Sequence, residues 1–160
     1  MAVDMFIKIG TVAGESVDAS HKGEIDVLSW SWGASQSGAG HTGGGSGAGK
    51  VQIQDLTLTK YIDKASATLF KMCCAGEHLD QALLVVRKAG GKPLEYLKIT
   101  MNQVMVTSIS TGGSGGQDRL TENITLNFSK VKMEYTPQTD KAGGDPSVVA
   151  GWDISANKPV

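Results

Sequence analysis

The 160-residue chain has few cysteines and no long apolar run. Its two cysteines, Cys73 and Cys74, are neighbours in the sequence. Adjacent cysteines rarely bridge, because the ring they would close strains the intervening peptide, so we expect no structural disulfide. No stretch approaches the 18 apolar residues of a membrane-spanning helix. The start, "MAVDMFIKIG", lacks a basic segment followed by an apolar run, so no Sec-type signal peptide is visible.

The chain also lacks an excess of charge of either sign. It carries 15 lysine and arginine residues against 16 acidic ones, for a net charge of -1. This near balance argues against electrostatic binding to nucleic acid or to an anionic membrane. A low net charge also does little to keep copies of the chain apart, so it is compatible with self-association.

Glycine, by contrast, is abundant, and much of it gathers in residues 38–49 and 112–116. The run "GAGHTGGGSGAGK" (38–50) fits the dinucleotide pattern G-x-G-x-x-G and all but the last residue of a phosphate loop. Both motifs need a helix directly after the loop, because helix amides hold the phosphate. The β-patterned residues from Val51 follow instead, so we interpret the run as a long hairpin loop.

Apolar residues alternate with polar ones along much of the chain, which is typical of half-buried strands. In residues 24–35, Trp30 and Trp32 share one face and Ser29 and Ser31 share the other, which predicts one packed side and one polar side. The phase changes near Gln54-Asp55, where we expect a bulge, and near Ser129-Lys130, where we expect a bulge or a bend. The predicted strands are 3–9, 24–35, 51–59, 81–90, 94–111 and 121–137.

One segment, "DKASATLFKMCCAG", predicts a helix, with Asp63 as N-cap and Gly76 in the left-handed position after it. We interpret residues 138–160, which are rich in glycine, proline, aspartate and serine, as a tail with Trp152 and Ile154 as its anchors. Because regular helices do not separate the strands, a parallel α/β sheet is disfavoured. We therefore expect six to eight strands in a single mainly β domain, a two-sheet antiparallel β-barrel or sandwich with one short α-helix alongside.

Candidate chemical groups are scattered. His21, His41 and His78 do not form a metal-ligand spacing, and we interpret His78 as part of a surface turn. Asp118, Arg119 and Glu122 bunch after a glycine loop and suit a turn or a contact between subunits better than acid–base catalysis. No nucleophile elbow and no Cys–His pair is present. We therefore expect no catalytic, metal or cofactor site.

Several segments occur in a recognisable order through about residue 137. They are "MAVDMFIKIG", "EIDVLSWSWG", the glycine-rich loop ending "GAGKV", "DLTLTKYIDKAS" and "STGGSGGQDRLTENITLNFSKVKMEY". Together they resemble the haemolysin-coregulated protein (Hcp) family of bacterial type VI secretion systems. The segments containing "WSWG" and "STGGSGG" followed by "DRLTEN" are the most specific.

The resemblance implies a structural role. Family members fold as a β-barrel-like pair of sheets with a helix beside them and form hexameric rings that stack into a tube. A sheathed machine propels the tube, tipped by a VgrG-type spike protein, out of the cell. Effector proteins can ride inside the ring, and export from the cytoplasm needs no cleaved signal peptide.

The resemblance also suggests roles for residues of this chain. Ser31, with Ser29 beside it, is the candidate contact to cargo in the ring lumen, although the same face could be an outer, solvated surface. His41, Thr42 and Lys50 are the candidates for a loop that contacts neighbouring subunits or rings. Asp118, Arg119 and Glu122 are the candidates for the interface between subunits. The alternatives are a soluble β-barrel binding module that works alone and, less favoured, an enzyme.

Overall fold

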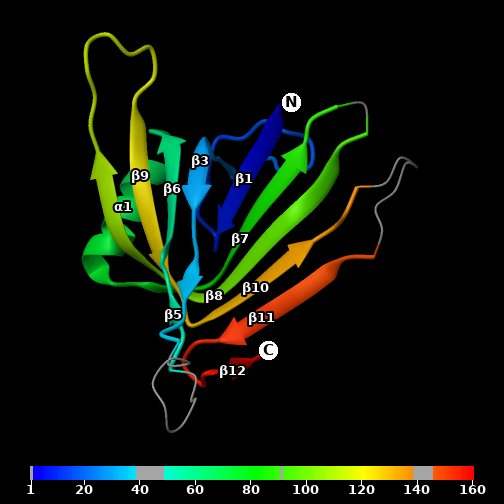
Figure 1. Ribbon diagram of the computed structural model, residues 1–160. Helices are drawn as coiled ribbons and strands as arrows, with labels where there is room; N and C mark the ends of the chain where they lie inside the picture. The colour runs from blue at the N-terminus through cyan, green and yellow to red at the C-terminus, as the bar shows by residue number, and fades with distance from the viewer. Residues whose placement is uncertain (1, 39–48, 91, 139–145) are drawn as a thin grey trace, which may run out of the picture.

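The computed structural model describes residues 2–38, 49–90, 92–138 and 146–160 (Figure 1). These residues form twelve strands and one helix. In chain order the elements are β1 (Val3–Ile9), β2 (Ile25–Asp26), β3 (Ser29–Ser31), β4 (Ala34–Ser35), β5 (Gln52–Ile53), β6 (Leu56–Tyr61), α1 (Ala65–Ala75), β7 (His78–Lys88), β8 (Leu94–Thr111), β9 (Thr121–Asn127), β10 (Lys130–Tyr135), β11 (Val148–Asp153) and β12 (Lys158–Pro159).

Ten of these strands form one antiparallel sheet, which changes neighbours along the 18-residue strand β8. Residues 97–102 of β8 pair with β10, whereas residues 105–111 pair with β9. Gln103, between the two halves, has a positive φ of 52°, a value that is uncommon outside glycine. The sheet therefore has two parts that share β8. One part contains β7, β10 and β11, and the other contains β9, β6 and β3 (Figure 1).

The core lies between these parts and the helix. Strand alternation turns one face of each strand inward, and the largest fully buried apolar side chains come from six strands and α1. They are Ile7, Ile9, Ile25, Leu56, Leu58, Leu69, Leu84, Ile99, Met101, Ile124 and Leu126. Helix α1 covers its share of this core by packing against β8. The expected mainly β, antiparallel fold with one short helix is confirmed, although the large sheet doubles over and does not close into a barrel.

The helix ends as the sequence predicts and begins one residue later than expected. Lys64, not Asp63, occupies the N-cap position. Asp63 still satisfies a free helix amide, because its Oδ1 accepts a hydrogen bond from the Ala65 backbone N–H at 2.9 Å. Gly76 has the left-handed conformation, with φ of 64°, and its N–H is bonded to the Met72 carbonyl.

Both phase changes in the sequence mark breaks between strands. At Gln54 and Asp55 the chain leaves β5, which pairs with β4 in a separate two-stranded sheet, and enters β6. Across this point the pairing register shifts by one residue, since Ser31 is opposite Thr57 whereas Ala34 is opposite Ile53, so the bulge expected there is confirmed. At Phe128 and Ser129 the chain passes from β9, in one part of the large sheet, to β10 in the other, as the predicted bend requires.

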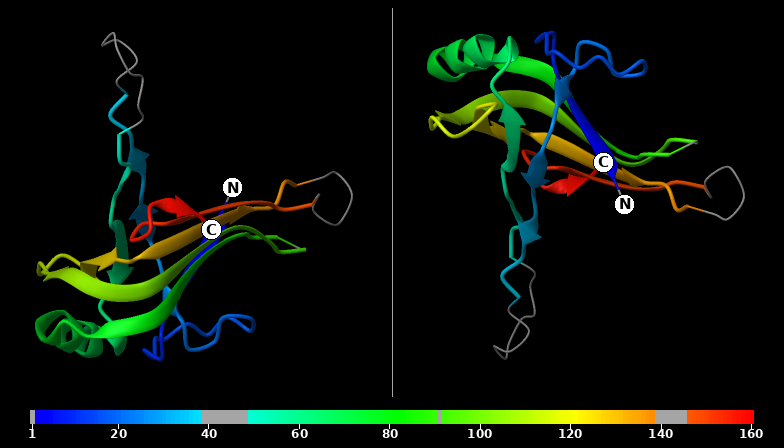
Figure 2. Two further views of the ribbon diagram at one scale, coloured as in Figure 1. Left: turned by 90° about the horizontal axis from the view of Figure 1, so that it is seen from below. Right: turned by 90° about the horizontal axis from the view of Figure 1, so that it is seen from above.

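Other predicted strands differ in extent. The segment 24–35 forms three short strands, because the chain leaves β1 and joins β6 midway: the Val27 N–H donates to the Met5 carbonyl and the Leu28 N–H to the Thr59 carbonyl. Strand β7 begins at residue 78, and part of the expected tail forms β11 and β12. These divisions explain why the strand count exceeds the six to eight expected. Figure 2 shows β4 and β5 projecting from the sheet.

Candidate functional site

The outward face of β3, β6, β9 and the second half of β8 carries two rows of small polar side chains. Pairing register aligns them across all four strands, since directly opposed residues lie on the same face. The first row is Ser29, Thr59, Asn123 and Ser110, and the second is Ser31, Thr57, Thr125 and Ser108. We call these eight residues the polar face.

The polar face is neutral and partly cross-linked by its own hydrogen bonds. The Thr59 hydroxyl donates to Asn123 Oδ1 at 2.7 Å, and the hydroxyls of Thr57 and Thr125 lie 3.4 Å apart. Both serines of β3 are exposed. Hydroxyl and amide groups can each donate and accept, so this surface suits hydrogen bonding to water or to a polar protein surface.

An acidic residue lies at one end of the polar face. Asp55, at the break between β5 and β6, accepts hydrogen bonds from Asn127 Nδ2 at 2.9 Å and from the Thr107 hydroxyl at 3.3 Å. At the other end the β8–β9 hairpin forms a depression of about 350 Å³ whose lining includes Ser114, Gln117 and Asn123. The polar character of the face therefore continues beyond the two rows.

Sequence reasoning identified two members of this face and missed six. Ser29 and Ser31 lie on the side opposite Trp30 and Trp32, which are half-buried against the core, as the alternation predicts. The remaining six were recoverable in part. In β6, for example, Thr57 alternates with the buried Leu56 and Leu58, which places it on the outward face.

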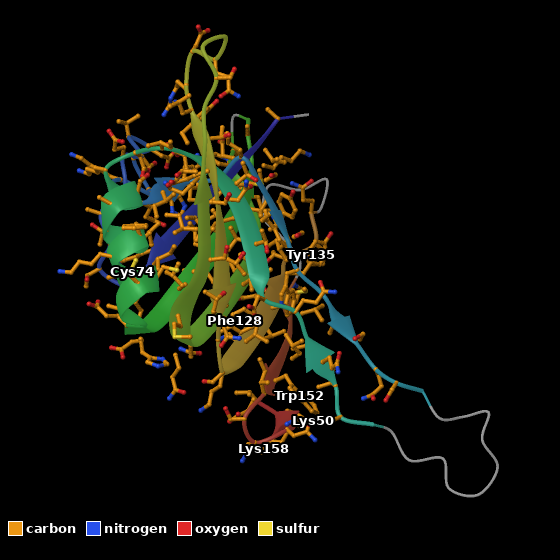
Figure 3. All side chains as sticks on the ribbon, turned by 90° about the vertical axis from the view of Figure 1, so that its left-hand side faces the viewer. Lys50, Cys74, Phe128, Tyr135, Trp152 and Lys158 are labelled. Atoms are coloured by element: carbon orange, nitrogen blue, oxygen red, sulfur yellow. The ribbon has the colours of Figure 1, made fainter. Side chains whose placement is uncertain are left out.

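The candidates for the contact loop fall mostly outside the described residues. His41 and Thr42 lie in the interval 39–48, which is not described. Lys50 is exposed, next to β5 (Figure 3). Its neighbours Gly49 and Val51 line a groove together with Trp152.

The three candidates for the subunit interface do not share a surface. Asp118 and Arg119 are exposed in the β8–β9 hairpin, where the Arg119 guanidinium lies 3.7 Å from the Tyr61 ring centroid. Glu122 is only 1% exposed and forms an ion pair with the buried Lys60. Placing Glu122 at a subunit surface is therefore wrong, because strand alternation turns its carboxylate inward.

The described histidines are far apart. His78 is the exposed first residue of β7 and not part of a turn. His21 is buried and its Nδ1 and Nε2 lie 2.8 and 2.7 Å from carboxylate oxygens of Glu24 and Glu95. Its ring also stacks on Phe6, so it fastens the loop after β1 to the sheet. Within the described ranges, no group of three His, Cys, Asp or Glu side chains is placed to hold a metal ion.

A second charged contact fastens the same loop. Arg87 Nη1 donates to Asp18 Oδ1 at 3.0 Å, and its Nη2 donates to Asp4 at 3.2 Å. The hydrogen bond from Arg87 lowers the pKa of Asp18 to about 2. The same carboxylate raises the pKa of Arg87. This pair is therefore ionised at neutral pH and ties the loop to β7.

No helix in the described part of the chain is long and apolar enough to cross a membrane. Both cysteines of the chain, Cys73 and Cys74, are free thiols on α1.

Comparison with known proteins shows that the sequence and fold of the chain are similar to those of secretion-system components. Residues 6–135 match the family model described as "Type VI secretion system effector, Hcp". Protein hcp1 of Pseudomonas aeruginosa is 60% identical over 159 residues, which cover 98% of each chain.

Solved structures agree with the sequence match. The crystal structure of Hcp1 from Salmonella typhimurium is 42% identical, covers the whole of both chains and superposes with a TM-score of 0.82. A structure described as that of a type six secretion system protein is 31% identical, covers 99% of this chain and all of the other, and has a TM-score of 0.93.

Proposed function

Because the chain belongs to the Hcp family of secreted type VI secretion system proteins, we propose that it is a tube subunit that forms hexameric rings. These rings stack into a tube beneath a spike protein and within a sheath, and they carry effector proteins in their lumen. The tube leaves the cytoplasm through the secretion machine without cleavage of a signal peptide.

The polar face is the observation that carries this proposal. Four neighbouring strands present eight neutral hydroxyl or amide side chains on one side, while Leu58 and Ile124 are buried on the other. A water-filled lumen needs a wetted surface that is continuous across strands. An uncharged lining can also bind different polar cargo surfaces without strong selection for charge. In the proposed ring this face borders the lumen, and Ser31 and Ser29 contact cargo.

The remaining candidates are proposed as contacts between copies of the chain. Lys50, with His41 and Thr42, contacts the neighbouring ring or subunit, and Asp118 and Arg119 contribute to the interface within a ring. Strand β3 supports this proposal, because β6 is its only partner strand in the described part of the chain and an unpaired edge needs to be covered. Each subunit would offer one surface to a different surface of the next, which is the arrangement that closes a ring.

Light scattering after size-exclusion chromatography tests the assembly. We expect a particle of six times the 16.7 kDa chain mass. A monomer at tens of micromolar would contradict the ring and would favour a binding module that works alone.

Protection of a co-expressed effector tests the cargo role. Ser31→Gln adds bulk at the β3 end of the second polar row and should lower the recovery of a bound effector at least several-fold while rings persist. Ser20→Gln is the matched control, since Ser20 is exposed in the loop after β1 and lies outside the polar face. Equal effector recovery with both variants would remove the cargo assignment.

A further inference from the structure

The loop after β1, residues 10–24, carries a buried histidine whose two ring nitrogens both face carboxylates. His21 Nδ1 lies 2.8 Å from Glu24 Oε2, directly before β2. His21 Nε2 lies 2.7 Å from Glu95 Oε1 on β8, 74 positions away in the sequence. We call these three residues the histidine clasp. The imidazole ring therefore bridges the end of the loop and the large sheet.

Packing fixes the plane of this ring. It stacks on Phe6 of β1, with the two ring centroids 4.4 Å apart and the planes 12° from parallel. The His21 backbone N–H also donates to the Asp18 carbonyl, and the His21 carbonyl accepts from the Glu24 N–H. The other orientation with the same plane is a ring flip, which exchanges both nitrogens for carbon atoms. The two carboxylates therefore select the orientation in which both nitrogens face an oxygen.

These two contacts need more hydrogen atoms than a neutral histidine carries. A neutral imidazole has one N–H and one nitrogen that can only accept, and an ionised carboxylate can also only accept. The imidazolium ion has two N–H groups, so it can donate to Glu24 and to Glu95 together. The arrangement is therefore complete only when the clasp holds one proton more than a neutral imidazole between two carboxylates supplies.

The other charged groups near the clasp come from β1, β7, β8 and the loop itself. Arg87 of β7 is paired with Asp18 of the loop and with Asp4 of β1. This pair stays ionised at neutral pH, because the pKa of Asp18 is about 2. Lys98 of β8 lies 3.5 Å from Glu95 Oε2, the oxygen that the imidazole does not face. Of these kinds of side chain, only histidine ordinarily changes its charge between about pH 5 and pH 8.

We propose that protonation of His21 controls how tightly the loop after β1 is held to the sheet. When the ring carries two N–H groups, both carboxylates receive a hydrogen bond and the loop is closed. When the ring loses one proton, an unprotonated nitrogen faces the oxygen of Glu24 or Glu95, and two acceptors at that distance repel each other. That contact opens and the end of the loop loosens, while the Arg87–Asp18 pair continues to hold the middle of the loop.

Hydrogen exchange of the full-length protein, measured by mass spectrometry at one protein concentration, tests this. The peptides of interest cover residues 14–24, where the Ser16 N–H donates to the Glu24 carbonyl and the Gly23 N–H to the Ser16 carbonyl. Expressing the data as protection factors removes the intrinsic effect of pH on exchange. Between about pH 6 and about pH 8.5 the protection should fall about tenfold, because a hydrogen bond to a charged group is worth at least that factor. Peptides from β10 are the internal control and should not change.

Two variants separate the clasp from a general effect of pH. His21→Gln has one side-chain amide, which cannot donate to both carboxylates, so residues 14–24 should be weakly protected at both pH values. Glu24→Gln supplies an amide N–H to Nδ1, while the single N–H of a neutral imidazole donates to Glu95 from Nε2. Both contacts then persist without the second proton, so protection should be the same at both pH values. His78→Gln, at an exposed histidine of β7, is the matched control and should keep the wild-type response.

Three results would overturn the proposal. The first is equal protection of residues 14–24 at both pH values in the wild-type protein. The second is a wild-type pH response that persists in His21→Gln, with β10 still protected. The third is a wild-type pH response that persists in Glu24→Gln, which would show that the contact between Glu24 and the ring is not the one that opens.

Discussion

Two charged residues of this protein are buried because strand alternation places them on the core face, against the usual preference of charged side chains for the surface. Lys60 follows the same phase as the buried Leu56 and Leu58, and Glu122 follows the phase of Ile124 and Leu126. Alternation alone therefore predicted both side chains on the core face. The expectation that charged residues stay at the surface led Glu122 to be placed at a subunit interface. The error arose because its partner, Lys60, is 62 positions away in the sequence.

The buried Lys60–Glu122 pair gives the first prediction. Glu122→Leu leaves the Lys60 ammonium short of a partner and should destabilise the protein by about 3–5 kcal/mol. The double variant Lys60→Met/Glu122→Leu should be less destabilised than Glu122→Leu, because no unpaired charge remains at that pair. Urea unfolding at one fixed protein concentration measures both. Strict additivity of the single-variant effects would contradict the coupling.

The Asp18–Arg87 contact gives a prediction about pH. Because the folded-state pKa of Asp18 is about 2, below its ordinary value of 3.8, its contribution to stability is present above pH 4 and is lost as the pH falls toward 2. Asp18→Asn should therefore lower the Tm at pH 7, and the difference from wild type should shrink between pH 4 and pH 2. A difference that stays constant over that interval would show that the carboxylate charge plays no part.

At the scale of elements, the sequence predicted β8 to the residue and mislocated the shorter strands. The 18 residues of β8 are rich in side chains that favour strands, which predicted its full length, although the buried phase changes within it from Ile99 and Met101 to Val104 and Val106. Short strands depend on partners that are distant in the sequence. The phase change at Gln54-Asp55, for instance, is a one-residue register shift between the β4–β5 and β3–β6 pairings, and β6 also pairs with β9. Alternation marks such a place but does not say which strand each half joins.

The end of α1 provides the prediction at this scale. Gly76 has a positive φ with no heavy atom near its missing Cβ, so Gly76→Ala suffers from backbone strain alone. We expect a destabilisation of about 1–2 kcal/mol by chemical unfolding. Gly112→Ala is the matched control, since that site is equally open and has no positive φ. Equal effects of the two variants would contradict the role of the left-handed cap.

At the scale of the whole molecule, doubling the sheet over at β8 gives the protein two different surfaces. One side of β9 carries the polar face, and the other side carries the core and a pocket beside α1. Alternation in the sequence predicts which side chains of a strand share a face. It does not predict how far the polar rows run across the sheet, because they cross four strands whose register is set by tertiary pairing.

The account depends most on the polar face being the inner wall of a ring. Cryo-electron microscopy of the purified protein, at a resolution that separates strands, tests this directly. We predict annular particles in which β3, β6, β9 and the second half of β8 surround the central hole, with Ser31 at its wall. Annular particles with β3 on their outer surface, or no annular particles at all, would contradict it.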